Sequence, residues 1–460
     1  MIKKLEFKNF KSWKEANISF SKLTGFFGTN SSGKTSILQL ILLLKQTIES
    51  TDRAQTLEFG NDKTYMELGT FEDIISDHDL SKVLSFNIGW ELENLLEIKN
   101  PEKKNQTLFK GNYMALKSQI SQEAKSNLFV KELKYYFDGF NFSMTQKPND
   151  ENKYQLKTQA VEKEKDKRKF KFIRNIGRKW ALPEPTKFYG FPDQVNAYFK
   201  NTSFLSDLQL EFETLFSNVY YLGPLRDYPQ RQYTWAGSKP SDMGRRGERV
   251  IDALLSSNGK QKISRGKGNS QFTVVEYVAH WLKELELISS FRVVEIAKGA
   301  NLYRVYVKKN ESSSEVLITD VGFGVSQILP VITLCYYAPE GSTLIIEQPE
   351  IHLHPKIQAG LADVFMDAIK NKKIQIILES HSEHLLRRLQ RRIAEEKFDS
   401  EDASLYFCSN EKNNSKITTL DLDVFGNITN YPKGFFGDEM GEIAAMNKAI
   451  IQRKIKNEQN

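Results

Sequence analysis

The chain has 460 residues, of which 40% are hydrophobic, and its 65 Lys and Arg against 58 Asp and Glu leave a net charge of +7. This balance predicts a globular protein with a mildly basic face, so nucleic acid is a permitted partner. The two cysteines, Cys335 and Cys408, are too few for a disulfide framework or a zinc site, and we expect both to be buried in a protein of the reducing cytosol.

No run of the sequence approaches the ~20 apolar residues that a membrane helix needs. The start, MIKKLEFKNF, lacks the apolar core of a signal peptide. We therefore expect a cytoplasmic chain with no contact with a membrane.

The N-terminal region alternates polar and apolar residues in KLEFKNF, ANISFS and LTGFF, which predicts three short strands of one sheet. A glycine-rich turn at 28–35 follows these strands. The next segment, SILQLILLLKQTIES, has apolar residues on nearly every face, which is typical of a buried helix. Strand, loop and helix are thus predicted in that order.

The character of the chain changes at 82–200, where strand-like patches are separated by lysine-rich stretches such as VEKEKDKRKFKF. This segment is predicted to be an insertion. Its charged run is either a solvated face or a contact with a phosphate backbone, through residues such as Lys165, Lys167, Arg168 and Lys169. A helix over 270–288 and a hairpin around Gly299 are predicted next.

The last third alternates helical patterns with two continuous apolar runs of strand length, STLIIE and IQIILE. Such alternation is typical of parallel strands that helices cover on both faces. We therefore expect an α/β core.

The turn at 28–35 reads GTNSSGKT and fits G-x-x-x-x-G-K-[ST] between a predicted strand and a predicted helix. In this motif, backbone amides at the helix N-terminus cradle phosphates, the lysine adds charge, and the hydroxyl reaches Mg²⁺. The predicted nucleotide-binding residues are Gly28, Asn30, Ser31, Ser32, Gly33, Lys34, Thr35 and Ser36, with Thr35 on the metal.

A second glycine-rich turn, DVGFGVSQ at 320–327, opens the predicted helix ILPVITL. It is either a second site for the phosphate end of a nucleotide or a helix simply capped by Ser326. The residues expected to contact nucleotide here are Gly322, Gly324, Ser326 and Gln327.

Two strand ends carry the remaining candidates. Glu347 ends the first apolar strand, where we expect it to hold the Mg²⁺ shell opposite Lys34 and Thr35. His381 follows the second strand and is expected to reach a γ-phosphate or to be a structural residue. A metal site at His352 and His354 is the weaker alternative, because no third ligand is evident.

Four phrases in this order resemble the Walker A, signature, Walker B and switch-histidine motifs of ABC-type ATPases, and they are GTNSSGKTS, VGFGVSQ, IIEQPEIHLHP and ESHSEH. More narrowly, the chain resembles the soluble branch related to RecF, SMC and overcoming-lysogenization-defect (OLD) ATPases. The phrases YLGPLRDYPQRQY and YPKGFFGDEMGEIA tighten the resemblance to bacterial OLD-like ATPases, many of which belong to anti-phage defence systems. The resemblance covers about 1–69 and 220–445.

The resemblance implies ATP and Mg²⁺ as cofactors and a head-to-tail dimer or higher oligomer. Each ATP would lie between Lys34 of one subunit and the 322–327 turn of another. The Walker B strand of the family usually ends in Asp-Glu, so Glu347 takes the metal role and Gln348 replaces the general base. A glutamine orients water without taking its proton, which predicts slow turnover. Glu350 is the alternative base.

The predicted fold is an ABC-type P-loop ATPase, with a mixed sheet flanked by helices and a β-rich insertion. Its parts are an N-terminal ATPase half (1–81), the insertion (82–200), a connecting region (201–310), a C-terminal ATPase half (311–437) and a C-terminal helix (438–460). The predicted function is a nucleotide-gated ATPase of anti-phage defence that controls a separate effector such as a nuclease. Duplex DNA is a further possible partner. Alternatives are a RecF-like repair ATPase and, less favoured, a transporter motor subunit.

An OLD-type nuclease would add a C-terminal domain with clustered acids. The chain has only Asp421 and Asp423 in that region, so we expect it to cut no DNA itself.

Overall fold

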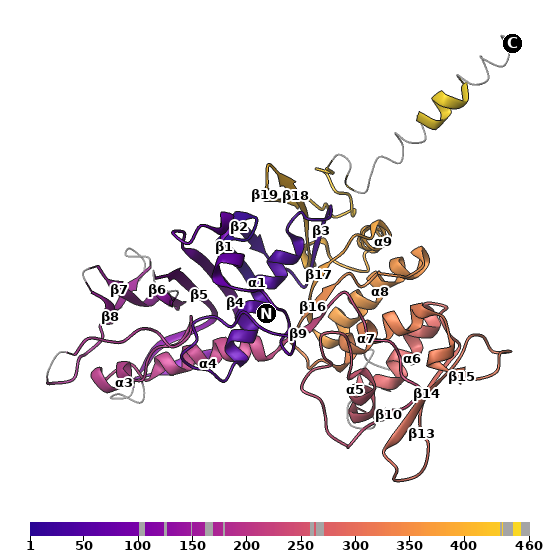
Figure 1. Cartoon of the computed structure of the whole chain (residues 1–460), viewed down its shortest axis with the longest axis horizontal. Helices are drawn as coiled ribbons and strands as arrows, with labels where there is room; N and C mark the ends of the chain where they lie inside the picture. Colours follow the sequence, from indigo (N-terminus) through magenta and orange to yellow (C-terminus); the bar gives the residue numbers. More distant parts are fainter. Residues whose placement is uncertain are drawn as a thin grey trace.

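The computed structural model describes residues 1–100, 106–123, 127–148, 150–161, 169–177, 180–257, 262–263, 271–432, 435 and 445–451. Two large sheets and a group of helices make up the described chain (Figure 1). No described helix is long and apolar enough to span a membrane.

A six-stranded sheet in the order β19-β18-β3-β17-β16-β9 forms the centre. Neighbouring strands of this sheet are parallel, except for the antiparallel pair β18–β19 at one edge. The sheet is therefore mixed, as predicted. Its strands are β3 (Leu23–Gly28), β9 (Val219–Leu222), β16 (Thr343–Glu347), β17 (Gln375–Glu379), β18 (Ala403–Glu411) and β19 (Asn414–Leu420). β3, β16 and β17 are fully buried, which explains their continuous apolar sequences.

The central sheet separates two hydrophobic cores, because alternate side chains of a strand point to opposite faces. Ile345 and Ile377 belong to one core, while Ile346 and Leu378 belong to the other. The first core contains α1 (Lys34–Glu49) and the second contains α7 (Phe323–Tyr337) and α8 (Pro355–Lys372). Helices thus cover both faces, as the alternating pattern predicted, and Cys335 and Cys408 are buried as expected.

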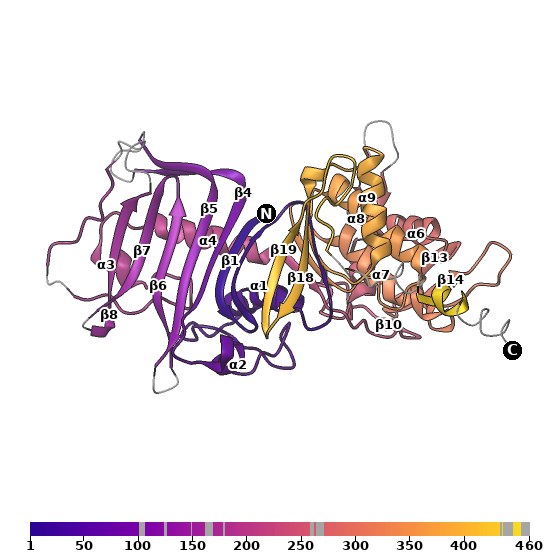
Figure 2. The same ribbon diagram turned by 90° about the horizontal axis from the view of Figure 1, so that it is seen from above.

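The second sheet has seven antiparallel strands in the order β2-β1-β4-β5-β6-β7-β8 (Figure 2). They are β1 (Ile2–Phe10), β2 (Trp13–Ser19), β4 (Leu84–Lys99), β5 (Thr107–Gln122), β6 (Leu128–Phe137), β7 (Phe140–Lys147) and β8 (Asp150–Ala160). The prediction of a β-rich insertion is confirmed. The prediction that the first three strands form one sheet is wrong, because β1 pairs with β2 and β4 while β3 joins the central sheet.

Two helices, α3 (Gln194–Tyr198) and α4 (Phe204–Ser217), follow these strands in the chain and precede β9. They pack on the seven-stranded sheet. The ring centroid of Phe212 on α4 lies 5.4 Å from that of Trp90 on β4. Three of the lysine-rich residues singled out above, Lys165, Lys167 and Arg168, lie outside the described residues, whereas Lys169 is exposed.

The remaining elements form a lobe beside α7 and α8. They are α5 (Val250–Ser257), α6 (Val274–Glu284), α9 (Glu383–Ala394), β10 (Tyr233–Thr234), β13 (Ser290–Glu295), β14 (Leu302–Lys308) and β15 (Val316–Leu317). β13 and β14 pair as the predicted hairpin. Smaller elements are α2 (Phe71–Ile74), β11 (Lys262–Ile263) and β12 (Phe272–Thr273). Residues 445–451 are helical and are drawn apart from the body in Figure 1.

Candidate nucleotide site

The glycine-rich loop runs from the end of β3 to the start of α1, as the motif requires. Gly28 and Gly33 have φ values of 139° and 88°, which favour glycine. A Cβ atom would lie 2.1 Å from the carbonyl oxygen of Cys408 at Gly28, and 2.4 Å from Oγ of Ser415 at Gly33. Both glycines are therefore needed for the loop to lie against β18 and β19.

Lys34 is the first residue of α1 and is 3% exposed. Its Nζ donates hydrogen bonds to the carbonyl oxygens of Gly28 at 3.1 Å and Thr29 at 2.7 Å, so the ammonium group lies across the loop. Burial lowers the pKa of Lys34, and the nearby carboxylate of Glu379 partly opposes this effect. The arrangement holds a positive charge where amides of the loop and helix meet, which is the environment of a phosphate.

Glu379 is the acid nearest to the loop. β17 lies between β3 and β16, so its last residue faces the start of α1. Oγ1 of Thr35 donates a hydrogen bond to Oε2 of Glu379 at 2.8 Å. Gln348 bonds twice to the same residue, because its backbone N–H donates to the Glu379 carbonyl at 2.8 Å and its side chain contacts the carboxylate. None of the sequence motifs predicted a role for Glu379.

A cavity of about 290 Å³ lies over the loop. Its lining brings together Ser12, the loop residues 30–36, Gln348, Glu379 and His381. His381 lies at the exposed rim, and reduced solvent contact around its ring, with a smaller contribution from the Lys34 charge, lowers its pKa. Residues from three predicted motifs therefore meet in one cavity.

Glu347 and Glu350 lie behind this cavity and do not line it. Glu347 is 5% exposed, and its Oε1 accepts a hydrogen bond from the Tyr221 hydroxyl at 2.9 Å. Burial, with a smaller effect of the Glu379 charge, raises the pKa of Glu347 to about 7. Oε1 of Glu350 accepts from the backbone N–H of His381 at 2.5 Å, and burial raises the pKa of Glu350. Glu379, and not Glu347, thus contacts the Thr35 hydroxyl.

The three buried glutamates and the Thr35 hydroxyl provide hard oxygen atoms of the kind that bind Mg²⁺. No group of three or more His, Cys, Asp or Glu side chains among the described residues could hold a metal ion alone. Mg²⁺ in phosphate-transferring sites is usually held by one or two carboxylates together with the substrate phosphates. The residues therefore fit a metal that arrives with a nucleotide.

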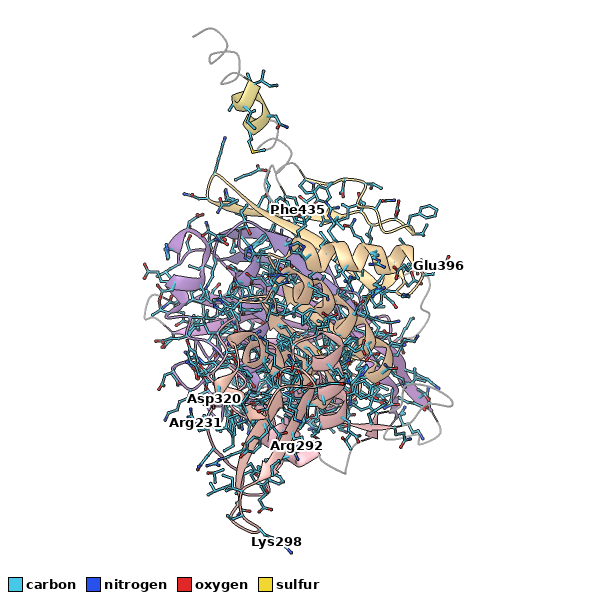
Figure 3. All side chains as sticks on the ribbon, turned by 90° about the vertical axis from the view of Figure 1, so that its right-hand side faces the viewer. Arg231, Arg292, Lys298, Asp320, Glu396 and Phe435 are labelled. Atoms are coloured by element: carbon cyan, nitrogen blue, oxygen red, sulfur yellow. The ribbon has the colours of Figure 1, made fainter. Side chains whose placement is uncertain are left out.

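The second glycine-rich turn lies away from this cavity. None of the described residues lining the cavity comes from 320–327. α7 begins at Phe323 with Gly322 before it, so Ser326 lies one turn inside the helix and is 7% exposed. The alternative that Ser326 caps this helix is wrong. Asp320 forms an ion pair with Arg231 at 2.9 Å beside the turn (Figure 3).

Gly322 differs from the glycines of the first loop. Its φ of −58° is available to any residue. It is exposed, and a Cβ atom built on it meets nothing within 4 Å. Contacts within the described chain therefore do not require glycine at this position. Gly324 is more enclosed, with Cδ2 of Leu353 at 3.7 Å from a built Cβ.

The two histidines after β16 shape the turn that leads to α8. Nδ1 of His354 accepts from the backbone N–H of Lys356 at 3.3 Å and caps the helix. His352 has a φ of 61° in the same turn.

Asp423, near the C-terminal end of the described chain, accepts hydrogen bonds from the backbone N–H groups of Phe425 and Asn427 and organises a loop.

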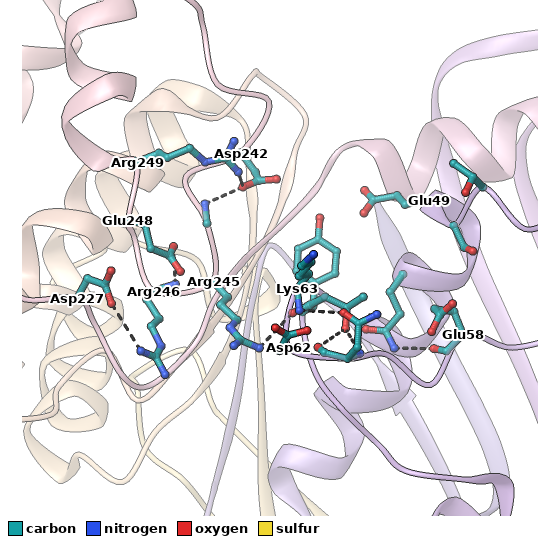
Figure 4. A pocket seen from close by; sticks show the side chains of 17 residues that line it. Glu49, Glu58, Asp62, Lys63, Asp227, Asp242, Arg245, Arg246, Glu248 and Arg249 are labelled. Atoms are coloured by element: carbon teal, nitrogen blue, oxygen red, sulfur yellow. Dashed lines mark hydrogen bonds and ion pairs between the residues drawn. The ribbon is translucent and has the colours of Figure 1, made fainter. Parts of the chain in front are cut away.

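A larger polar cavity of about 950 Å³ lies at the opposite end of α1 (Figure 4). Arginines of 245–249 face acids of 49–62 across it, and Arg246 and Arg249 pair with Asp227 and Asp242 at 3.8 and 2.5 Å. The glycine-rich loop contributes no described residue to its lining. Size alone therefore does not identify the nucleotide site.

Three family models match the chain. Residues 1–209 match a family described as "AAA ATPase domain", and residues 190–387 match one described as "AAA domain, putative AbiEii toxin, Type IV TA system". Residues 398–446 match a family described as "Protein of unknown function (DUF3696)". No curated protein matches the sequence.

The chain also has low similarity to solved structures of SMC heads. The SMC head bound to the C-winged helix domain of ScpA is 13% identical, with 92% of this chain and 98% of that chain covered and a TM-score of 0.45. The SMC head domain from Thermotoga maritima is 11% identical, with coverage of 92% and 99% and a TM-score of 0.40. The two AAA matches and the loop at 28–35 support an ABC-type P-loop ATPase.

Proposed function

We propose that the chain binds ATP with Mg²⁺ in the cavity over the glycine-rich loop and hydrolyses it slowly. The observation that carries this proposal is the meeting of the loop, Gln348, Glu379 and His381 in one cavity. The loop joins β3 to α1, Gln348 follows β16, and Glu379 and His381 lie at the end of β17, so their convergence depends on the strand order of the central sheet. The ends of parallel strands at such a point are where α/β proteins bind ligands.

The chemistry follows from the side chains. Loop amides and Lys34 would hold the phosphates, and His381, at the rim of the cavity, would contact the terminal one. Thr35 and Glu379 would hold the Mg²⁺, with the buried carboxyl of Glu347 behind them, and the metal would neutralise the charge that develops on the phosphates. Gln348 orients the attacking water by hydrogen bonds but takes no proton from it. Slow turnover is the consequence.

We further propose that a second copy of the chain completes the site. The turn at 322–327 is a helix N-terminus, and Gly322 is exposed without any need for glycine inside its own chain. A glycine at a helix N-terminus lets another backbone or a phosphate approach closely. ATP bound between Lys34 of one copy and this turn of another would hold the two together.

The proposed biological role is defence against phage or other foreign DNA, with a separate effector such as a nuclease. The description of the family that matches 190–387, which names a toxin of a toxin–antitoxin system, supports this placement. We also propose that lysines of the insertion bind duplex DNA.

Mixing two inactive variants tests the shared site. Lys34→Ala removes the loop cation, and Gly322→Arg blocks the turn at a position where the single chain has room for a side chain. We expect each variant alone to lack ATPase activity. An equal mixture should recover about a quarter of the wild-type rate, because half of randomly formed dimers are mixed and each has one intact site. A mixture as inactive as its parents would contradict the shared site.

A further inference from the structure

Arg226 is a buried cation that the proposed chemistry has not used. It follows β9, the edge strand that pairs in parallel with β16. The backbone around it is fixed on both sides, since the N–H of Gly223 donates to the carbonyl of Arg245 at 2.8 Å and the N–H of Asp227 donates to that of Arg246 at 3.1 Å. Arg226 therefore enters the end of the central sheet from a rigid turn.

Arg226 is 6% exposed, and its guanidinium group donates one hydrogen bond, from Nη2 to the carbonyl oxygen of Glu347 at 3.1 Å. Its Nε and Nη1 are buried without a hydrogen-bond partner. Oε2 of the nearby Glu350 is also buried without one. A buried charge with unused donors is a poor way to stabilise a fold, because its desolvation is incompletely offset. The arrangement points to a role in the site.

The carbonyl that Arg226 holds belongs to the peptide group that leads into Gln348. The N–H of the same peptide group donates to the carbonyl of Glu379 at 2.8 Å. This peptide group is thus held at both ends, by Arg226 on the oxygen and by β17 on the nitrogen. Gln348 has a φ of 42°, an unfavourable value for a side chain of this size that persists only where the surroundings impose it.

We propose that Arg226 is a positioning residue for ATP hydrolysis: by holding the Glu347–Gln348 peptide group, it keeps the Gln348 side chain over the cavity. The inference rests on the proposed function. Arg226 lies outside the lining of the cavity, so it acts through Gln348 and not on the nucleotide. The expected consequence of its loss is a lower rate with little change in nucleotide affinity.

The test compares Arg226→Gln and Arg226→Lys with Arg245→Gln in the full-length chain. Arg245 is a matched control, because its Nη1 also donates to a backbone carbonyl, that of Thr64, at 3.1 Å but in the cavity at the far end of α1 (Figure 4). We expect Arg226→Gln to lower kcat at least about tenfold with ATP affinity nearly unchanged. Arg226→Lys should restore part of the rate, and Arg245→Gln should leave it unchanged.

A double-mutant cycle with Gln348→Ala separates positioning from general damage. If Arg226 acts through Gln348, adding Arg226→Gln to Gln348→Ala has little further effect on kcat. Full additivity, or a wild-type rate for Arg226→Gln in a chain that hydrolyses ATP, would overturn this inference alone. A wild-type chain without any ATP turnover would instead contradict the proposed function, and the inference with it. Thermal melting of each variant identifies one that has failed to fold.

Discussion

The Thr35 hydroxyl donates a hydrogen bond of 2.8 Å to Glu379, and this contact joins the first turn of α1 to the last residue of β17. The two residues are 344 positions apart in the chain, and their contact depends on β17 lying beside β3. It places a carboxylate next to the hydroxyl that the loop motif offers to Mg²⁺.

Glu379→Gln should therefore weaken Mg²⁺-dependent ATP hydrolysis by about 10–100-fold, the usual effect of removing a group that orients a metal ligand. Titrating Mg²⁺ at fixed ATP measures the effect. Glu383→Gln is the control, because Glu383 pairs with Arg387 on the surface of α9 and lies outside the cavity lining. Equal activity of Glu379→Gln and wild type at low Mg²⁺ would contradict the role.

Sequence reasoning found the loop because its chemistry is local. GTNSSGKT specifies the turn, and the flanking patterns specify β3 and α1. It did not find Glu379, because the order of β3, β17 and β16 is a long-range property that no local pattern shows. An acid at the end of the second apolar strand was the available signal. The resemblance to ABC-type ATPases drew attention to Glu347 instead.

The other misses have the same origin. β1 pairs with β4, about 80 residues away in the chain, and not with β3. An alternation of polar and apolar residues predicts a strand but not the strand with which it pairs. The sequence does not indicate a buried position for Arg226, because an arginine in a turn usually lies in solvent. Its burial follows from the backbone bonds of Gly223 and Asp227 to 245–246.

The ATPase rate depends on whether Gln348 or Glu350 acts on the attacking water. Gln348 lines the cavity, whereas Glu350 is 7% exposed behind it and one of its oxygens is bound to the backbone of His381. We expect a low wild-type ATPase rate, an increase of about tenfold or more with Gln348→Glu, and only a mild effect of Glu350→Gln. Steady-state rates of the three purified proteins provide the comparison. A fast wild type that collapses with Glu350→Gln and ignores Gln348→Glu would show that Glu350 is the base.

The free energy of unfolding of the nucleotide-free chain should depend on pH through Glu347. Burial raises its pKa from 4.5 to about 7. The folded protein thus binds this proton more tightly than the unfolded chain does, and stability falls as the pH rises from about 4.5 to 7. The shift corresponds to about 3 kcal/mol.

Urea unfolding at pH 5 and pH 7.5 measures this difference. Wild type should lose more stability between the two values than Glu347→Gln, by about 2–3 kcal/mol. Glu286→Gln, at a side chain that is 69% exposed, should behave as wild type. If wild type and Glu347→Gln lost the same stability between pH 5 and pH 7.5, Glu347 would not be the source of the pH dependence.

Calorimetric titration of Mg-ATP into three proteins measures whether ATP binds over the glycine-rich loop. Lys34 and Lys45 are both on α1, both 3% exposed, and both donate to backbone carbonyls, but Lys45 contacts Phe216 away from the cavity. We predict that wild type and Lys45→Ala bind Mg-ATP with similar affinity and that Lys34→Ala shows no binding. Binding by Lys34→Ala with the wild-type affinity would contradict the account.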